Sequence, residues 1–272
     1  MIYPSVNNMQ KRFQQIGAVG GLLALLLLAL VLLNPVSDTN PENLHSANVE
    51  TNTSISDLSD YFDIIVRGEA DSSLEIANLK QIVAQLPEDH TKAVDRLFLI
   101  YDDPKATRGL GGSKSIFLRA VNVSEEEFIS LFVHELGHIV DLGLIKGNSD
   151  IQTDFYDSTT PIYSDDLSLN FYRICWQNGQ TRNQNCSDSD FVSGYARTDV
   201  FEDFAESYLY YVLHGKEFRE IAKSSEALTA KYNYLKNIFS EKEFDTGTLN
   251  NIKWLRPWDA TLLKWGNSLI EL

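Results

Sequence analysis

The fold of this chain is best predicted from residues 124–141, which read SEEEFISLFVHELGHIVD. Ser124 followed by Glu127 is typical of a capping box, in which the serine caps a helix and the glutamate reaches back to it. Apolar residues then recur at helical spacing: Phe128, Leu131, Phe132, Leu136 and Ile139. The stretch therefore predicts a helix with one face in the core and a separate face that carries His134 and His138.

Two histidines four residues apart lie one above the other on a helix, so the imidazoles of His134 and His138 can reach a single ion. Glu135 projects toward the same site, where it can accept a proton from water on the metal. A His-Glu-x-x-His run in a helix is the arrangement of zinc metalloproteases, and we expect one Zn²⁺ ion here. The alternative is a surface helix with two unrelated histidines, which need not show such a division of faces.

A catalytic zinc ion needs a third protein ligand. The metzincin pattern would place a histidine six residues after His138, but that residue is Leu144. Asp141 is on the correct face, yet it lies about 10 Å along the helix axis from His134. We therefore expect Asp141 to contact a metal ligand rather than the metal itself, or to serve as a charge at the end of the helix.

The remaining candidate is a second acidic helix at residues 199–213, which read DVFEDFAESYLYYVL. Glu202 and Glu206 are four apart on one face of this helix, close to its apolar side. Carboxylates beside a buried stripe need a partner, which a cation would supply. A solvated acidic face is the alternative interpretation.

Two blocks, HELGHIVD at 134–141 and SGYARTDVFEDFAE at 193–206, resemble the zinc peptidases related to anthrax lethal factor. That group includes the Pro-Pro endopeptidases of clostridia. The resemblance implies an α+β, zincin-like domain, in which a small sheet packs on the His-Glu-x-x-His helix and the C-terminal part is helical. This sequence departs from the family in having Ala196 where glycine is usual, and in a longer gap between the blocks.

The resemblance also implies roles for individual residues: Glu202 as the third zinc ligand, Tyr195 facing the metal and Glu206 as a carboxylate behind the ligands. Zinc chemistry would then let Glu135 pass a proton from water to the leaving amine, while the Tyr195 phenol donates to the developing oxyanion. We expect a zinc endopeptidase acting on a peptide or protein. The alternatives are a cell-wall peptide amidase and a non-catalytic binding module on the same scaffold, which would not need Glu135.

Length and composition predict a tethered domain. The chain has 272 residues, 43% of them hydrophobic, and a net charge of −15, which argues against nucleic acid as a partner. Residues 16–33 are uniformly apolar and follow Lys11 and Arg12, which predicts a single membrane span with residues 1–15 in the cytoplasm. Residues 34–56 read as a flexible linker, and 57–272 as the extracytoplasmic peptidase domain. A cleaved signal peptide, giving a secreted protein, is the alternative.

Local patterns predict the remaining elements of the domain. Helices are expected at 57–65 and 74–86, a turn or bulge at 109–112, and mostly helix from 215 to 239. Strands are expected at 97–101 and 115–121, the second at the sheet edge that pairs with extended substrate. Three tryptophans near the end, Trp254, Trp258 and Trp265, are expected to pack on the domain.

Cys175 and Cys186 are the only cysteines in the sequence. On the oxidising side of a membrane, a disulfide between them is favoured over two free thiols. A zinc site is the rival use, but no pair of histidines flanks these cysteines. We therefore expect a disulfide that closes a surface loop between the two metal-binding helices.

Overall fold

Seven α-helices and two small sheets make up the part of the chain that the computed structural model describes, residues 58–248 and 256–266. The predicted α+β class is confirmed. The membrane span predicted at 16–33, the linker predicted at 34–56 and Trp254 lie outside the described residues. Within the described ranges, no helix has the length and apolar character needed to cross a bilayer.

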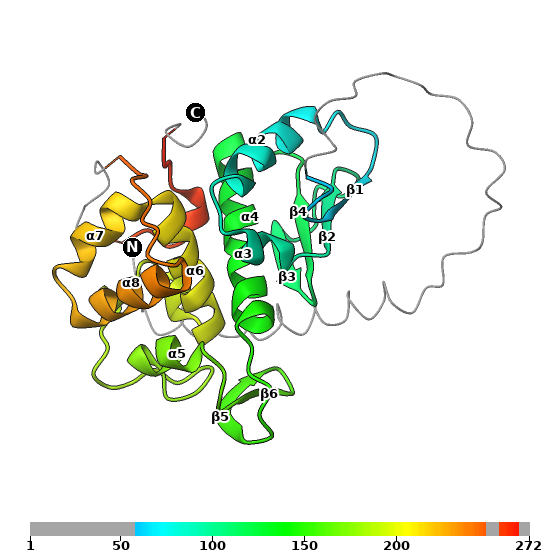
Figure 1. Ribbon diagram of the computed structural model, residues 1–272. Helices are drawn as coiled ribbons and strands as arrows, with labels where there is room; N and C mark the ends of the chain where they lie inside the picture. Colours follow the sequence, from blue (N-terminus) through cyan, green and yellow to red (C-terminus); the bar gives the residue numbers. More distant parts are fainter. Residues whose placement is uncertain (1–57, 249–255, 267–272) are drawn as a thin grey trace, which may run out of the picture. The chain divides into compact units, whose positions relative to one another are not determined.

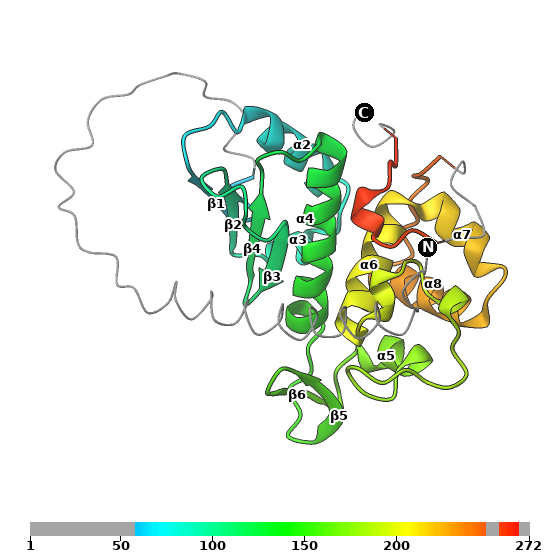
Figure 2. The same ribbon diagram turned by 180° about the vertical axis from the view of Figure 1, so that it is seen from behind.

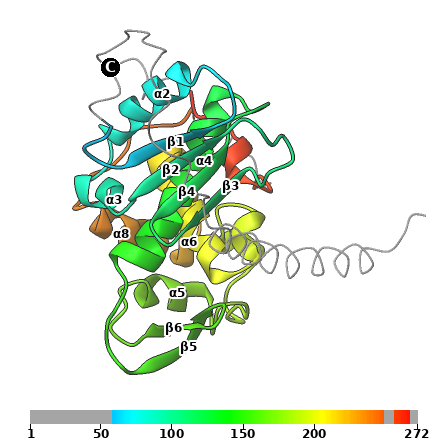
Figure 3. The same ribbon diagram turned by 90° about the vertical axis from the view of Figure 1, so that its right-hand side faces the viewer.

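Four strands form the main sheet in the order β1-β2-β4-β3 (Figure 1). The first three are parallel, namely β1 (Asp63–Arg67), β2 (Arg96–Ile100) and β4 (Ser115–Arg119). The edge strand β3 (Gly109–Gly112) runs antiparallel to β4. Side chains that alternate along β2 and β4 are completely buried on one face of the sheet: Leu97, Leu99, Ile116 and Leu118. Figure 3 shows the sheet in front of the long helix α4 (Glu125–Ile139), which contacts β3 and β4.

The sheet confirms two sequence predictions and corrects three. The strands expected at 97–101 and 115–121 are β2 and β4. The turn or bulge expected at 109–112 is wrong, because these residues form β3. The expectation that 115–121 lies at the sheet edge is also wrong, because β4 lies between β2 and β3. The helix expected at 57–65 is wrong, because residues 58–61 form a turn and the chain from Asp63 forms β1, which pairs with β2.

The glycines of β3 allow this strand to lie directly on α4. A Cβ atom added at Gly109 would lie 2.3 Å from the Oε1 atom of Glu135. One added at Gly111 would lie 2.6 Å from the Glu135 carbonyl oxygen. Glycine weakens a strand in isolation, but it is used where another backbone approaches closely. The close approach to α4 therefore explains a glycine-rich strand that local propensity disfavours.

Helix α4 packs closely against α6 (Val200–Leu213). At their crossing, a Cβ atom added at Gly137 would lie 3.0 Å from the Cα atom of Ala205. The start of α4 is capped as predicted, since the Ser124 hydroxyl accepts a hydrogen bond from the Glu127 amide at 3.2 Å. The Glu127 carboxylate, however, binds the Arg108 guanidinium at 2.8 Å. The predicted apolar stripe of α4 is buried in full.

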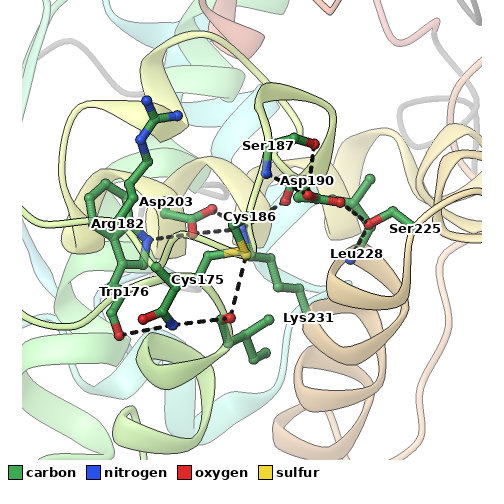
Figure 4. The surroundings of a disulfide bond; sticks show 12 residues. Cys175, Trp176, Arg182, Cys186, Ser187, Asp190, Asp203, Ser225, Leu228 and Lys231 are labelled. Atoms are coloured by element: carbon green, nitrogen blue, oxygen red, sulfur yellow. Dashed lines mark hydrogen bonds and ion pairs between the residues drawn. A yellow bond between two sulfur atoms is a disulfide. The ribbon is translucent and has the colours of Figure 1, made fainter.

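The chain between α4 and α6 forms a π-helical turn, a hairpin and a short helix at the far end of α4 (Figures 1 and 2). These elements are Val140–Leu144, β5 (Gln152–Asp157) with β6 (Thr160–Tyr163), and α5 (Leu169–Cys175). The predicted disulfide joins Cys175 to Cys186, with Cα atoms 5.5 Å apart (Figure 4). It closes a loop in the segment between the two long helices, as predicted.

Two further helices and a returning segment complete the domain. The helical pattern expected from 215 to 239 is confirmed as α7 (Gly215–Ala222) and α8 (Glu226–Ile238). Residues 256–266 return to α4 and α6 and include one turn of 3-10 helix at Ala260–Leu262. Trp265 packs into the core as predicted, whereas Trp258 lies against Gly194 and is 61% exposed.

Candidate metal centre

Three predicted ligands meet between α4 and α6. The Oε2 atom of Glu202 lies 3.2 Å from Nε2 of His134 and 3.5 Å from Nε2 of His138. One donor atom from each residue lies within 4.8 Å of the others. The histidines come from successive turns of α4 and the glutamate from the first turn of α6. This partly buried group could bind a metal ion, as the sequence predicted.

The burial and spacing of the donor atoms favour a bound cation over direct hydrogen bonds among the three side chains. The Oε2 atom of Glu202 is buried and has no hydrogen-bond partner among the described residues. A buried carboxylate oxygen without a donor is uncommon and calls for an ion or other partner. Ligand atoms at about 2.0–2.2 Å from a tetrahedral metal lie about 3.3–3.6 Å from one another. The two separations from Oε2 of Glu202, 3.2 and 3.5 Å, are close to that spacing.

The imidazoles and carboxylates of the group shift one another's pKa values. Burial lowers the pKa of His134, but the nearby Glu202 and Glu206 carboxylates outweigh burial and raise the pKa well above its ordinary value. Burial raises the pKa of Glu202, yet the two imidazoles hold it far below its usual range. The metal-free group therefore favours charged imidazoles beside a charged carboxylate. A metal must displace those protons, so metal affinity falls as the pH falls.

Glu206 lies directly behind one ligand. Its Oε1 atom is 3.1 Å from the Nδ1 atom of His134, and its side chain is completely buried. Such a partner would fix the ring so that Nε2 faces a metal ion bound by this group. The second oxygen, Oε2, accepts a hydrogen bond from the backbone amide of Ala260 at 2.9 Å. Glu206 therefore connects the ligand on α4 to the returning segment 256–266.

Asp141 is buried below the site, in the π-helical turn that follows α4. Its two carboxylate oxygens accept hydrogen bonds from the Tyr172 hydroxyl at 2.7 and 2.8 Å. Burial raises the pKa of Asp141 to about 7. The structure thus places this carboxylate against a residue of α5, and its predicted role behind the ligands remains a prediction.

Glu135 is buried between α4 and the edge strand. The absence of side chains at Gly109 and Gly111 leaves room for its carboxylate. Burial raises the pKa of Glu135 above its ordinary value, although the neighbouring imidazoles and the backbone of Gly111 oppose that shift. A carboxylate with a raised pKa is a stronger base than one in water.

Tyr195 lies on the α6 side of the site, in a turn of 3-10 helix. Its hydroxyl donates a hydrogen bond to the Oε1 atom of Glu202 at 3.1 Å, and its ring centroid is 6.2 Å from that of His134. Burial and the Glu202 carboxylate raise the pKa of Tyr195 above its ordinary value, so the phenol stays protonated and can donate. The residue is therefore brought to the site as predicted.

Sequence reasoning missed three contributors to the site. Asp199 caps α6, because its Oδ1 atom accepts from the amides of Phe201 and Glu202 at 3.0 and 2.9 Å. This cap fixes the turn that carries the ligand, and the start of the predicted helix at Asp199 was its available signal. The glycines of β3 were visible as a run in the sequence, but they were interpreted as a turn or bulge and were not connected with the site. The Ala260 contact uses only a backbone amide, which leaves no signature in the sequence.

No protein-family model matches the chain, and no curated protein matches it significantly.

Proposed function

We propose that this chain is a membrane-tethered, zinc-dependent endopeptidase whose catalytic domain lies outside the cytoplasm. One observation carries the proposal. A buried carboxylate, Glu135, lies beside a three-donor group formed by His134, His138 and Glu202, and it is not itself a member of that group. A structural metal site is usually closed by a fourth protein ligand and needs no base.

The donor set supports zinc. Two imidazole nitrogens and one carboxylate oxygen are common ligands of catalytic zinc, with a fourth position left for water or substrate. In the part of the chain that the structure describes, the group contains no fourth histidine, cysteine, aspartate or glutamate. The resemblance of the two sequence blocks to lethal factor-related peptidases supports the same metal.

The residues around the group suit hydrolysis of a peptide bond. A zinc ion held there would supply Lewis acidity, polarising a carbonyl group and lowering the pKa of water toward 7. Glu135 accepts the proton of the attacking water and delivers it to the leaving amine. Tyr195 reorients its hydroxyl from Glu202 to donate to the developing oxyanion. Glu206 keeps the proton on Nδ1 of His134 and fixes the orientation of the ring.

The edge strand supports an extended peptide as the substrate. β3 ends the sheet, so only one of its sides pairs with another described strand. An extended peptide can add to such an edge through main-chain hydrogen bonds. Because Gly109 and Gly111 lie against Glu135, a peptide bound along β3 would pass beside the base.

The disulfide supports an oxidising location. Disulfides persist outside the cytosol and are rare within it. The bond between Cys175 and Cys186 is therefore compatible with a domain carried across the membrane by residues 16–33.

The deciding experiment is cleavage of a peptide library by the full chain in detergent, with products identified by mass spectrometry. Zinc-loaded protein should cleave, protein treated with chelator should not, and zinc should restore cleavage. Glu135→Gln should keep one zinc ion and lose most turnover, because an amide cannot accept the proton. Glu125→Gln, an exposed change on the same helix, is the matched control. Absence of cleavage by the loaded protein, or undiminished cleavage by Glu135→Gln, would refute the proposal.

A further inference from the structure

The segment 256–266 reaches the candidate metal centre through one backbone group. The Ala260 amide donates to Oε2 of Glu206 at 2.9 Å, and Oε1 of the same carboxylate lies 3.1 Å from Nδ1 of His134. All three residues are buried. A continuous chain of polar contacts thus runs from the C-terminal segment to a metal-ligand ring.

The segment is held on both sides of this contact. On the N-terminal side, the Pro257 and Trp258 carbonyls accept hydrogen bonds from the amides of Gly194 and Tyr195 at 2.8 and 2.6 Å. On the C-terminal side, the buried indole of Trp265 donates to the Ser130 hydroxyl of α4 at 3.2 Å. The segment therefore spans from the turn before α6 to the middle of α4, and Ala260 lies between these anchors.

A guanidinium group fixes the residues on either side of Ala260. Arg108 forms an ion pair with Asp259 and donates to the Thr261 hydroxyl at 3.2 Å. The same guanidinium binds Glu127 of α4 at 2.8 Å. Arg108 directly precedes β3, so one side chain connects the edge strand, the start of α4 and the C-terminal segment. The contacts on both sides of Ala260 thus hold its amide toward Glu206.

We propose that the backbone amide of Ala260 is a positioning donor of the metal centre. It holds Glu206 in the rotamer that keeps the proton on Nδ1 of His134, which leaves Nε2 free to bind the metal. Without this donor, one oxygen of a completely buried carboxylate loses its partner, and Glu206 can turn away from the histidine. The proposal rests on the metal site of the proposed function, and it does not depend on peptide hydrolysis.

Local geometry offers a substitution that removes this donor. Ala260 is the first residue of the 3-10 turn, and Asp259 before it is extended, with φ −135° and ψ 118°. Proline is accepted at the first position of a helical turn and after an extended residue. Ala260→Pro therefore suits the local backbone conformation, deletes the amide hydrogen and places a ring methylene group against Oε2 of Glu206. Glu226→Pro is the matched control, because Glu226 is exposed, begins α8 and follows the extended Ser225.

The experiment compares the full-length protein with these two variants in detergent. Zinc affinity is measured by competition with a chromophoric chelator, and metal geometry by the visible absorption of the Co²⁺-loaded protein. The His134 tautomer is measured by ¹⁵N NMR without metal, at a pH high enough to make the imidazole neutral. Ala260→Pro should weaken zinc binding about 10- to 100-fold, change the Co²⁺ spectrum and deplete the Nδ1–H tautomer. Glu226→Pro should match the wild type. Wild-type affinity, spectrum and tautomer in folded Ala260→Pro would overturn the proposal.

A second variant decides the matter if Ala260→Pro does not fold. Arg108→Gln removes the ion pair to Asp259 and leaves Glu206 and the Ala260 amide chemically intact. It should weaken zinc binding at least several-fold, and Arg108→Lys, which restores the charge, should recover part of the loss. Wild-type affinity in Arg108→Gln would then overturn the proposal. If the wild type binds neither zinc nor Co²⁺, the metal site itself is refuted, and absence of the Nδ1–H tautomer separately refutes the role of Ala260.

Discussion

The Nζ atom of Lys231 lies 2.7 Å from the Oδ2 atom of Asp203, and both side chains are completely buried. Asp203 directly follows Glu202 in α6, whereas Lys231 belongs to α8. Figure 4 shows the pair beside the disulfide, where Lys231 also donates to the Asp190 carbonyl at 3.0 Å and the Trp176 indole donates to Asp203 at 2.9 Å. This network fixes the turn of α6 that carries Glu202.

Lys231→Met should destabilise the domain by about 3–5 kcal/mol, because it leaves the Asp203 charge buried without its partner. Urea unfolding of the metal-free protein at pH 7 measures the loss. The double variant Lys231→Met with Asp203→Asn should recover much of it, since the amide carries no charge and can still accept from Trp176. A loss below about 1 kcal/mol in the single variant would contradict this account.

Gly109→Ala should reduce turnover about 100-fold while zinc binding is retained, because displacement of a catalytic group by about 1 Å has costs of that size. The added Cβ atom would lie 2.3 Å from the Glu135 carboxylate. Gly112→Ala is the control in the same strand, since no atom lies within 4 Å of a Cβ placed there. Turnover and zinc content of both variants are the measurements. Equal turnover in the two would show that β3 does not constrain the base.

Tyr195→Phe should lower kcat about 10- to 1000-fold and leave zinc content unchanged, because it removes one donor to the oxyanion. KM should change much less than kcat if the hydroxyl acts mainly in the transition state. Tyr156→Phe, on the exposed hairpin, is the control. Loss of zinc together with turnover would instead assign Tyr195 to holding Glu202, with which it shares a hydrogen bond.

His214 should make the domain less stable at mildly acidic pH. Burial lowers its pKa to about 4, and its Nε2 atom has no hydrogen-bond partner among the described residues. Since the unfolded pKa is near 6.5, the unfolded chain binds the proton first, and stability is lost as the pH falls from 6.5 toward 4. Between pH 7 and 5, the wild type should lose about 2 kcal/mol that His214→Phe retains.

Chemical unfolding of both proteins at pH 7 and pH 5, with metal removed, measures this difference. Other titrating groups are shared by the two proteins, so their contributions cancel. Phenylalanine keeps a ring next to Tyr210, whose ring centroid is 4.9 Å from that of His214. An identical pH dependence in the two proteins would show that His214 is already protonated in the folded state.

The parts of this molecule that sequence predicts well are those specified by local pattern. The start of α4 follows from Ser124, and its burial follows from an apolar repeat of helical period. The pairing of His134 with His138 is fixed by the geometry of a single helix. The predicted meeting of these histidines with Glu202, a residue of another helix, came from a resemblance between sequence blocks rather than from spacing.

The parts that sequence mispredicts are decided by distant contacts. β3 is a strand because a backbone without side chains fits against Glu135, whereas the propensity of glycine favours a turn. β1 is too short for its pattern to distinguish strand from helix, and pairing with β2 decides it. Ala260 could not be identified, because the group that contacts Glu206 is a main-chain amide that every residue except proline has.

The residues of the candidate metal centre are far apart in the sequence, so the ribosome adds them at different times. A nascent chain that ends in the hairpin β5–β6 contains His134 and His138 but neither Glu202 nor Ala260. Such a chain can offer a metal only two imidazoles. A metal ion dissociates far more readily from two ligands than from three. Stable metal loading therefore waits until the ribosome has passed α6. A truncated chain that stops before α6 would therefore carry the His-Glu-x-x-His helix without a complete candidate metal centre.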